Sequence, residues 1–224
     1  MPKLRKTLPK NFRELIQNGV DEEIKAALMK CEVGAYDYPS SKDTALFYTG
    51  LSREVTEWLL ARGERLNHCN SYGRIPLHAQ AEAQNGAVLL YLELGAEVNA
   101  VDCARETPLF RAAVSYQTEN IKILLAHGAN MYQKSKVSGY NALEAMLSQS
   151  TNGNIEKAVS VSEIFLSAGM PVSSAMQKSV TRMGRDYEFF KNLFSPQTGA
   201  AAKQGIMRLY ELFDVLPVPP IEQW

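Results

Sequence analysis

The chain has 224 residues, of which 46% are hydrophobic and 21% are charged, so its composition is that of an ordinary globular protein. This length suits one sizeable domain or two small ones. Lys plus Arg and Asp plus Glu both number 24, and a net charge of zero argues against general binding to nucleic acids or anionic membranes.

The cysteines and the N-terminus bear on the cellular compartment. Cys31, Cys69 and Cys103 are odd in number and widely spaced, which disfavours a disulfide framework and a zinc site. The basic residues at the N-terminus precede no apolar stretch, so they do not resemble a secretory signal. No apolar run approaches the roughly 20 residues that a membrane span needs. We therefore expect a cytoplasmic protein.

The first predicted elements are a pair of helices within residues 9–37. Phe12, Leu15 and Ile16 have the spacing of one helix face, and residues 19–28 indicate a turn followed by a second helix. Cys31 stands near the place where later copies of this pattern carry a glycine.

From residue 38 onward one pattern recurs, and two kinds of residue mark it. The leucines that follow the start of each predicted first helix are separated by 31, 32 and 34 residues: Leu46, Leu77, Leu109 and Leu143. The glycines that close each second helix are separated by 32, 33 and 41 residues: Gly63, Gly95, Gly128 and Gly169. Self-similarity of this period indicates stacked repeats, and the long last interval indicates an insertion, which we place at residues 148–154.

The copy at residues 102–130 shows what each recurring type of residue does within the unit. Thr107 is a good N-cap, and Pro108 suits the first helical position, where its missing N–H costs nothing. Ala112 keeps the first helix thin enough for a neighbour to pack closely. Gly128 can adopt the left-handed conformation that ends the second helix. The predicted unit is therefore helix, turn, helix, and an extended turn leading to the next unit.

This pattern resembles the ankyrin repeat, which has a period of about 33 residues and a Thr-Pro-Leu-His signature. The best copy spans residues 70–100 and contains Ile75-Pro76-Leu77-His78, where the resemblance implies that the histidine bonds local backbone and fixes the turn. The copy at 40–67 has a shortened middle, and the copy at 138–172 carries Asn141 and Glu144 in place of Thr and His. The resemblance covers roughly residues 9–172.

The resemblance implies an all-α fold, an ankyrin-repeat solenoid of helix-turn-helix units joined by β-hairpin-like turns. We expect a degenerate N-terminal capping repeat at residues 1–37 and four ankyrin repeats at 38–172. Residues 173–224 would form a divergent helical C-terminal cap with a proline-rich tail, since 176–194 and 200–213 look helical without the signature. The prolines exclude a helix over residues 215–220.

A search for catalytic chemistry yields no candidate constellation. The sequence has no glycine-rich phosphate loop, no two histidines at helical metal-ligand spacing, and no cysteine with a nearby base. We therefore predict no catalytic residues, no cofactor and no metal. An alternative is an enzyme with a site in residues 173–224, a segment that contains Lys178, Arg182, Arg185, Asp186, Tyr187, Glu188 and Lys203.

Candidate partner-binding residues are those near each hairpin turn and first helix that the repeat does not require. They are Tyr38, Asp43, Tyr72, Arg74, Arg105, Glu106, Arg111, Tyr116 and Tyr140. Tyr and Arg are the types enriched at interface hot spots, although ordinary solvated surface is the alternative for each. Arg111 replaces a residue that is usually small or apolar in the resembled family. It either reaches the concave surface or pairs with an acid such as Glu82 or Glu144.

The resemblance implies a non-catalytic protein–protein interaction module that binds a partner protein through its concave face. One version is a free-standing immunity protein that neutralises a bacterial toxin. A second version is a regulatory adaptor or inhibitor of an endogenous or host enzyme. In both versions the partner is another protein, neither nucleic acid nor membrane is bound, and a monomer is favoured.

Overall fold

The computed structural model describes residues 3–220, and eleven α-helices account for about half of them. Residues 1–2 and 221–224, which belong to the predicted terminal segments, lie outside the described part. The first elements are β1 (Arg5–Thr7), α1 (Phe12–Asn18), α2 (Asp21–Leu28), β2 (Cys31–Tyr36), the 3₁₀ turn η1 (Ala45–Phe47) and α3 (Arg53–Ala61). The next elements are α4 (Pro76–Glu82), α5 (Val88–Glu93), α6 (Pro108–Val114) and α7 (Thr118–Ala126). The last elements are α8 (Ala142–Gln149), η2 (Asn152–Asn154), α9 (Ile155–Ser167), α10 (Ser174–Phe190), η3 (Lys191–Leu193) and α11 (Pro196–Phe213).

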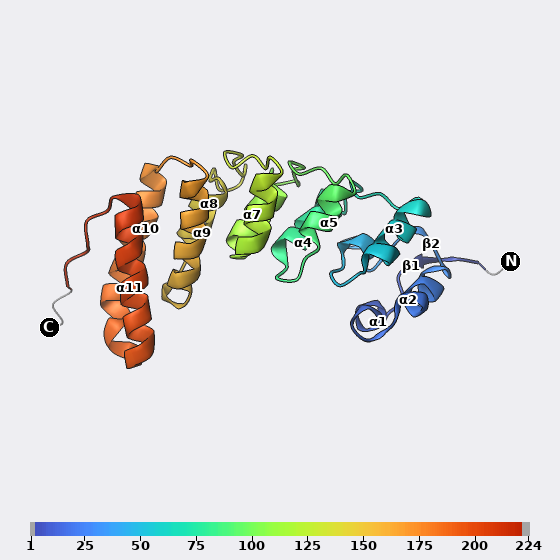
Figure 1. Ribbon diagram of the computed structural model, residues 1–224, viewed down its shortest axis with the longest axis horizontal. Coiled ribbons are helices and arrows are strands. Elements are labelled where there is room, and N and C mark those ends of the chain that lie inside the picture. Colours follow the sequence, from blue (N-terminus) through green and yellow to red (C-terminus); the bar gives the residue numbers. More distant parts are fainter. Residues whose placement is uncertain (1–2, 221–224) are drawn as a thin grey trace.

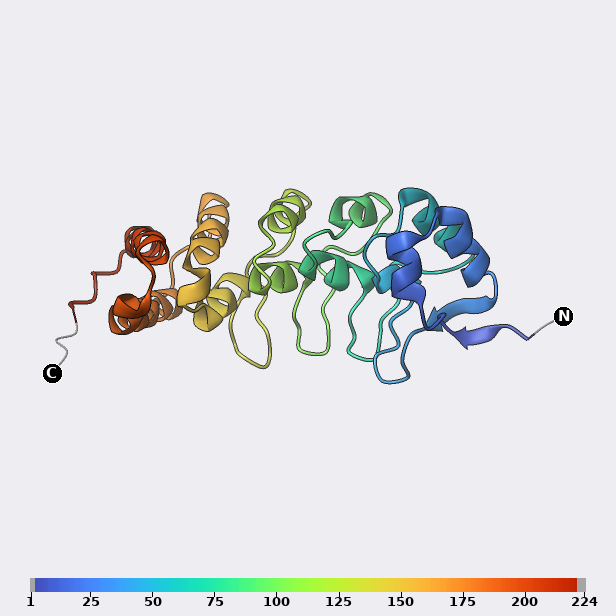
Figure 2. The same cartoon turned by 90° about the horizontal axis from the view of Figure 1, so that it is seen from below.

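The helices are arranged as pairs that stack in a row along the length of the molecule (Figure 1). The first helix of each pair packs on the first helix of the next pair, in the order η1, α4, α6, α8 and α10, which we call the inner helices. The second helices α5, α7, α9 and α11 pack on one another in the same order, and we call them the outer helices, together with α3. Figure 2 shows these two layers side by side.

Four loops project from the same edge of the row, beside the inner helices (Figure 2). Each is closed by a backbone hydrogen bond between its ends, from Asp37 N to Asp43 O, Asn70 N to Arg74 O, Asp102 N to Glu106 O, and Ser135 N to Tyr140 O. We call residues 37–43, 70–74, 102–106 and 135–140 the hairpin loops, and these loops together with the inner helices the inner face.

The four spaced leucines occupy equivalent places in this row. Leu46, Leu77, Leu109 and Leu143 are each the second residue of an inner helix, and each is fully buried. The start of the inner helices follows the predicted capping chemistry, because the side chain of Thr107 accepts from Phe110 N and that of Asn141 accepts from Glu144 N. The outer helices end at glycines with positive φ, as predicted: Gly63, Gly95, Gly128 and Gly169.

Polar side chains of one pair hold the carbonyl ends of the preceding inner helix. Nδ2 of buried Asn120, on α7, donates to the carbonyls of Gln80, Ala81 and Ala83 at the end of α4. The buried Gln80 side chain in turn donates to the carbonyls of Leu46 and Tyr48. These bonds satisfy the carbonyls that every helix C-terminus leaves without a partner.

Three features differ from the sequence-based expectation. First, residues 31–36 form a strand that pairs in parallel with β1, in which Cys31 and Ala35 are buried and Val33 between them is exposed. Second, the inner helix of the first full copy is only the three-residue turn η1, so Phe47 and Tyr48 do not lie on a regular helix. The cause is the shortened middle of that copy, in which Gly50 adopts a positive φ of 96°.

Third, the insertion placed at residues 148–154 is only partly a loop. Helix α8 continues to Gln149, and α9 has 13 residues where α7 has 9, so much of the added length extends the outer helix. As predicted, residues 215–220 form no helix, but α11 begins at Pro196, four residues before the expected start at 200. No helix within residues 3–220 is both long and apolar enough to cross a lipid bilayer.

Candidate functional site

The hairpin loops form a continuous row because each tip is hydrogen-bonded to the one before it. Ser71 N donates to Ser41 O at 2.8 Å, Cys103 N donates to Tyr72 O at 2.9 Å, and Lys136 N donates to Ala104 O at 2.9 Å. Within the loops, side chains such as Asn70 accept from the backbone two and four residues on. The loop backbone is therefore satisfied internally, and the side chains at the tips are available for other contacts.

Three predicted binding residues stand exposed on these tips. Tyr38 is 68% exposed and Tyr72 is 54% exposed, and Arg105 is also exposed. None of the three side chains makes a hydrogen bond or ion pair with a residue that the structure describes. Packing and hydrogen bonding within the described fold therefore give no reason for a tyrosine or arginine at these three positions.

Arg105 also has an unusual backbone conformation, with φ of 61°. The tip positions of the neighbouring loops, Gly73 and Gly139, have φ of 73° and 72° and are glycines. A left-handed conformation costs an L-residue with a Cβ roughly 1–2 kcal/mol, a cost that glycine avoids. Glycine at position 105 would avoid this cost, although Lys42 holds the same conformation in the first hairpin loop, with φ of 59°.

Four other predicted residues are engaged in contacts between neighbouring pairs, which corrects the expectation that the fold does not require them. The Arg111 guanidinium bonds both carboxylate oxygens of Glu82, at 2.7 and 3.1 Å, and its Nη1 lies 3.5 Å from Glu106 Oε2. Arg74 lies 3.3 Å from Asp102 Oδ2.

Asp43 is engaged in the same way, because its Oδ1 accepts from Asn70 Nδ2 at 2.6 Å. Burial raises the pKa of Asp43, and the bond from Asn70 partly offsets this rise. Of the two roles expected for Arg111, the pairing with Glu82 is confirmed. Glu144 is not the partner, because it accepts from Asn141 N and Ser173 Oγ instead.

The two remaining predicted tyrosines lie in different surroundings. Tyr116 lies in the turn between α6 and α7, at the opposite end of α6 from the hairpin loop, and its hydroxyl bonds Ser150 Oγ at 3.0 Å. Tyr116 therefore lies close to its first helix, as expected, but away from the hairpin loop. Tyr140 ends the last hairpin loop, where it is half-buried beside α10.

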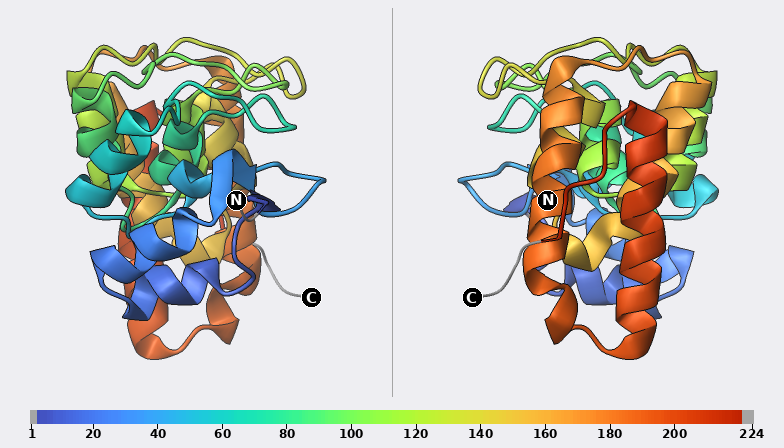
Figure 3. Two further views of the ribbon diagram at one scale, coloured as in Figure 1. Left: turned by 90° about the vertical axis from the view of Figure 1, so that its right-hand side faces the viewer. Right: turned by 90° about the vertical axis from the view of Figure 1, so that its left-hand side faces the viewer.

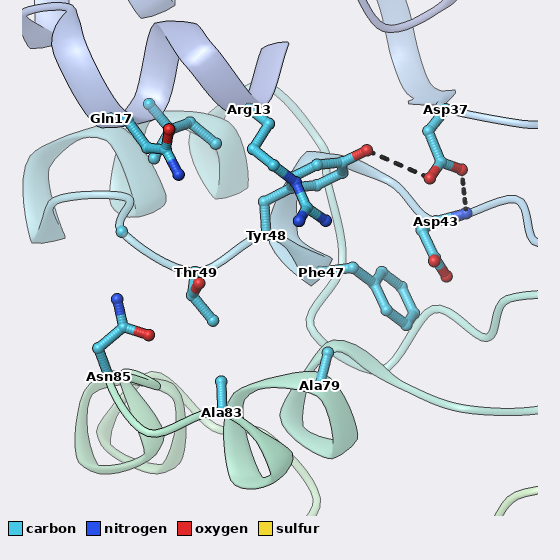
Figure 4. A pocket seen from close by; sticks show the side chains of 12 residues that line it. Arg13, Gln17, Asp37, Asp43, Phe47, Tyr48, Thr49, Ala79, Ala83 and Asn85 are labelled. Carbon is cyan, nitrogen blue, oxygen red and sulfur yellow. Dashed lines mark hydrogen bonds between the residues drawn. The ribbon is translucent and has the colours of Figure 1, made fainter.

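A hollow of about 530 Å³ opens on the inner face where η1 stops short (Figure 4). Arg13 and Gln17 point into it from α1, opposite Asn85 and two small side chains, Ala79 on α4 and Ala83 directly after it. None of these five residues was predicted from the sequence. The signal that could have found the hollow is the shortened copy at 40–67, because the space that a full inner helix would fill stays open.

The wall of this hollow carries a tyrosine held between opposite charges. The Tyr48 hydroxyl donates to Asp37 Oδ2 at 3.2 Å, and the Arg13 guanidinium lies 5.8 Å from the centre of the Tyr48 ring. Burial, together with the neighbouring Asp37 carboxylate, raises the pKa of Tyr48 to about 12. Tyr48 therefore stays a neutral phenol at physiological pH. The hollow thus has hydrogen-bonding side chains on one side and the small side chains of Ala79 and Ala83 on the other.

The sequence pattern predicts structural rather than catalytic roles for His78 and two of the cysteines. His78 Nδ1 accepts from Ile75 N at 3.2 Å and Nε2 donates to Glu106 O at 3.0 Å, so the predicted backbone bonding is confirmed. Burial lowers the pKa of His78. Cys69 and Cys103 are both exposed and are not joined to each other. Within residues 3–220, no group of three or more His, Cys, Asp or Glu side chains could hold a metal ion.

The sequence was also compared with known protein families, and no family model matches it. The candidate site therefore stands on the geometry of the inner face, namely the exposed loop tips and the hollow beside the first of them.

Proposed function

We propose that the chain is an ankyrin-repeat protein without catalytic activity, and that its inner face binds a partner protein. Two kinds of observation support the repeat family. The spaced leucines are equivalently buried, and the histidine of the signature bonds the backbone of its own helix start and of the next hairpin loop.

The observation that carries the binding role is the row of tip side chains that the fold leaves unused. Tyr38, Tyr72 and Arg105 project from successive loops that are fixed relative to one another by backbone hydrogen bonds. Tyr and Arg combine a large contact area with hydrogen bonding, which is why they are enriched at hot spots. A rigid row also loses little conformational entropy when a partner binds.

The test is co-purification of the partner from the native cell with the wild-type chain and with the double variant Tyr72→Ala/Arg105→Gly. Glycine at 105 suits the positive φ, so we expect the unfolding midpoint to be retained. Loss of two hot-spot side chains is expected to weaken partner binding by roughly 2 kcal/mol or more.

The matched control removes two exposed side chains from outer helices, Leu89→Ala/Lys122→Ala, and should bind as the wild type does. Recovery of no specific partner at low salt contradicts the proposal. An equal loss of binding in both double variants also contradicts it, because the inner face would then have no special role.

The identity of the captured protein separates the two roles that the sequence predicts. A secreted toxin whose gene lies beside the gene for this chain would identify an immunity protein. An endogenous or host enzyme would identify a regulatory adaptor or inhibitor.

A further inference from the structure

Helix α10 presents a polar stripe at the far end of the inner face. The spacing of four, three and four residues places its members on one side of the helix: Ser174, Lys178, Thr181 and Arg185. Figure 3 (right) shows α10 on the side of the molecule from which the hairpin loops project. The stripe therefore continues the inner face beyond the last hairpin loop.

Two shallow hollows flank this stripe. One, of about 390 Å³, lies between α10 and the residues Tyr140 and Ser148. The other, of about 330 Å³, lies on the opposite flank and includes Thr181 and Arg185. Lys178 lines both hollows, together with serine hydroxyls of α10. The surface is thus lined by ammonium, guanidinium and hydroxyl groups, which all donate hydrogen bonds.

The cations of the stripe are not neutralised by the fold. Lys178 and Arg185 are exposed and form no ion pair with any residue from 3 to 220. Arg182, beside them, pairs with Asp186 at 2.8 Å and also donates to the carbonyls at the end of α8. Arg182 is therefore committed to the structure, whereas Lys178 and Arg185 can bind an external group.

The carboxylates of the surrounding inner face are all occupied. Between residues 102 and 188, the carboxylates on this face are Asp102, Glu106, Glu144, Asp186 and Glu188. Each is bonded to Arg74, Arg111, Arg182, Lys191 or local backbone and serine groups. The other carboxylates of this range lie on the outer helices α7 and α9: Glu119, Glu156 and Glu163.

The neighbouring hairpin loop adds to the positive character, because Lys136 at its tip is exposed and forms no ion pair with a described residue. Although the net charge of the chain is zero, positive charge therefore collects on this part of the inner face. Such local segregation favours a partner surface of opposite sign.

We infer that the α10 stripe binds an acidic segment of the partner protein, whose Asp and Glu carboxylates accept from Lys178, Arg185 and the neighbouring hydroxyls. This inference deepens the proposed function and rests on it. Arginine can hold a carboxylate with two parallel hydrogen bonds, and lysine supplies a point charge beside it.

The test uses a fluorescein-labelled polyglutamate peptide, with binding followed by fluorescence anisotropy at low and physiological salt. The wild-type chain should bind the peptide, and binding should weaken with salt because exposed charges are screened. The variant Lys178→Glu/Arg185→Glu should bind about tenfold more weakly or worse, since like charges would then meet.

The matched control, Lys122→Glu/Lys157→Glu, makes the same change in net charge on the outer helices α7 and α9 and should bind as the wild type does. Both substituted pairs are exposed, so unchanged circular dichroism and unfolding midpoints are expected. No binding of polyglutamate above that of a neutral peptide overturns the inference, as does equal weakening in both variants. Tighter binding of single-stranded oligothymidylate at the same residues also overturns it, because the ligand would then be a nucleic acid.

The two proposals can fail separately. A captured partner that needs Tyr72 and Arg105 but binds the Lys178→Glu/Arg185→Glu variant at full strength leaves the proposed function standing and refutes the α10 site. Polyglutamate binding as expected, with no protein partner recovered from the cell, refutes the proposed function instead.

Discussion

The central helix pairs, α4–α5 and α6–α7, and the last described pair, α10–α11, occupy comparable places in the row but are held by different contacts. The central helices have six to nine residues, and their loops are joined by backbone hydrogen bonds. Helices α10 and α11 have 17 and 18 residues. Glycines allow close packing: Gly184 of α10 lies against Tyr210 of α11, and Gly205 of α11 lies against Ile155 of α9. The central pairs are thus joined through their loops as well as their helices, whereas the last pair is held by close helix packing.

The two regions also differ in electrostatics. In the central region Arg74 and Arg111 are paired with carboxylates of neighbouring loops and helices. On α10, Lys178 and Arg185 have no such partner among the described residues. The difference indicates that charge in the centre joins the pairs together, while charge on α10 is available for binding.

The largest expected effect comes from breaking the central region at Leu77. Leu77→Ala should lower the free energy of unfolding by about 2–5 kcal/mol, because the side chain is fully buried and its removal leaves a cavity. Chemical denaturation measures this loss. The control Leu89→Ala removes a leucine that is 44% exposed on α5 and should cost far less. Equal losses for the two variants would contradict the place of Leu77 in the core.

A smaller effect is expected at the last pair. A Cβ at position 184 would overlap the ring and hydroxyl of buried Tyr210, so Gly184→Ala should cost about 1–3 kcal/mol even though alanine favours helix. Thermal or chemical denaturation checks it. Gly153→Ala is the control, since its Cβ would lie 3.9 Å from the nearest atom. A stabilised Gly184→Ala variant would show that α10 and α11 do not pack this closely.

The free energy of unfolding should depend on pH through His78, which lies in the central region. Burial holds its pKa below 6.5 in the folded chain, so the unfolded chain takes up a proton first as the pH falls. The stabilisation by neutral His78 is thus present above about pH 6.5 and is lost below it. Chemical denaturation of wild type and His78→Gln should show a stability difference that shrinks from about pH 7 to about pH 5. A difference independent of pH would contradict the neutral, doubly bonded histidine.

The smallest effect is expected from exposed ion pairs that bridge outer helices in both regions. Arg53 lies 2.5 Å from Glu93, and Arg208 lies 2.9 Å from Glu163. Because water screens such exposed pairs, Arg53→Gln and Arg208→Gln should leave the unfolding midpoint nearly unchanged at low and high salt. A marked loss in either variant, confined to low salt, would show that ion pairs hold that region together.

The parts of the fold that the sequence could predict are those encoded locally. Short local patterns mark where single helices begin or end, namely Pro76-Leu77, the cap at Thr107 and Gly128. All three have the expected structure. The β1–β2 pair was missed because Arg5 pairs with Cys31, and no periodic signal joins segments so far apart.

The candidate site shows the same division. The exposure of Tyr72 and Arg105 could be predicted because both lie at loop tips whose turns are locally encoded. The pairing of Arg111 with Glu82 was one of the two roles expected for Arg111, and the stacked structure decides between them because the two residues are 29 positions apart. The hollow near Arg13 was not predicted, because it depends on a helix that stops early. Contacts of this kind arise only when neighbouring pairs are stacked.

Hydrogen–deuterium exchange of the chain with and without its captured partner tests the central claim, that binding uses the inner face, most directly. We expect added protection at the hairpin loops 70–74 and 102–106 and along α10, with exchange on the outer helices α5 and α7 unchanged. Protection that appears on α5 and α7 while the loops exchange as before would contradict the claim.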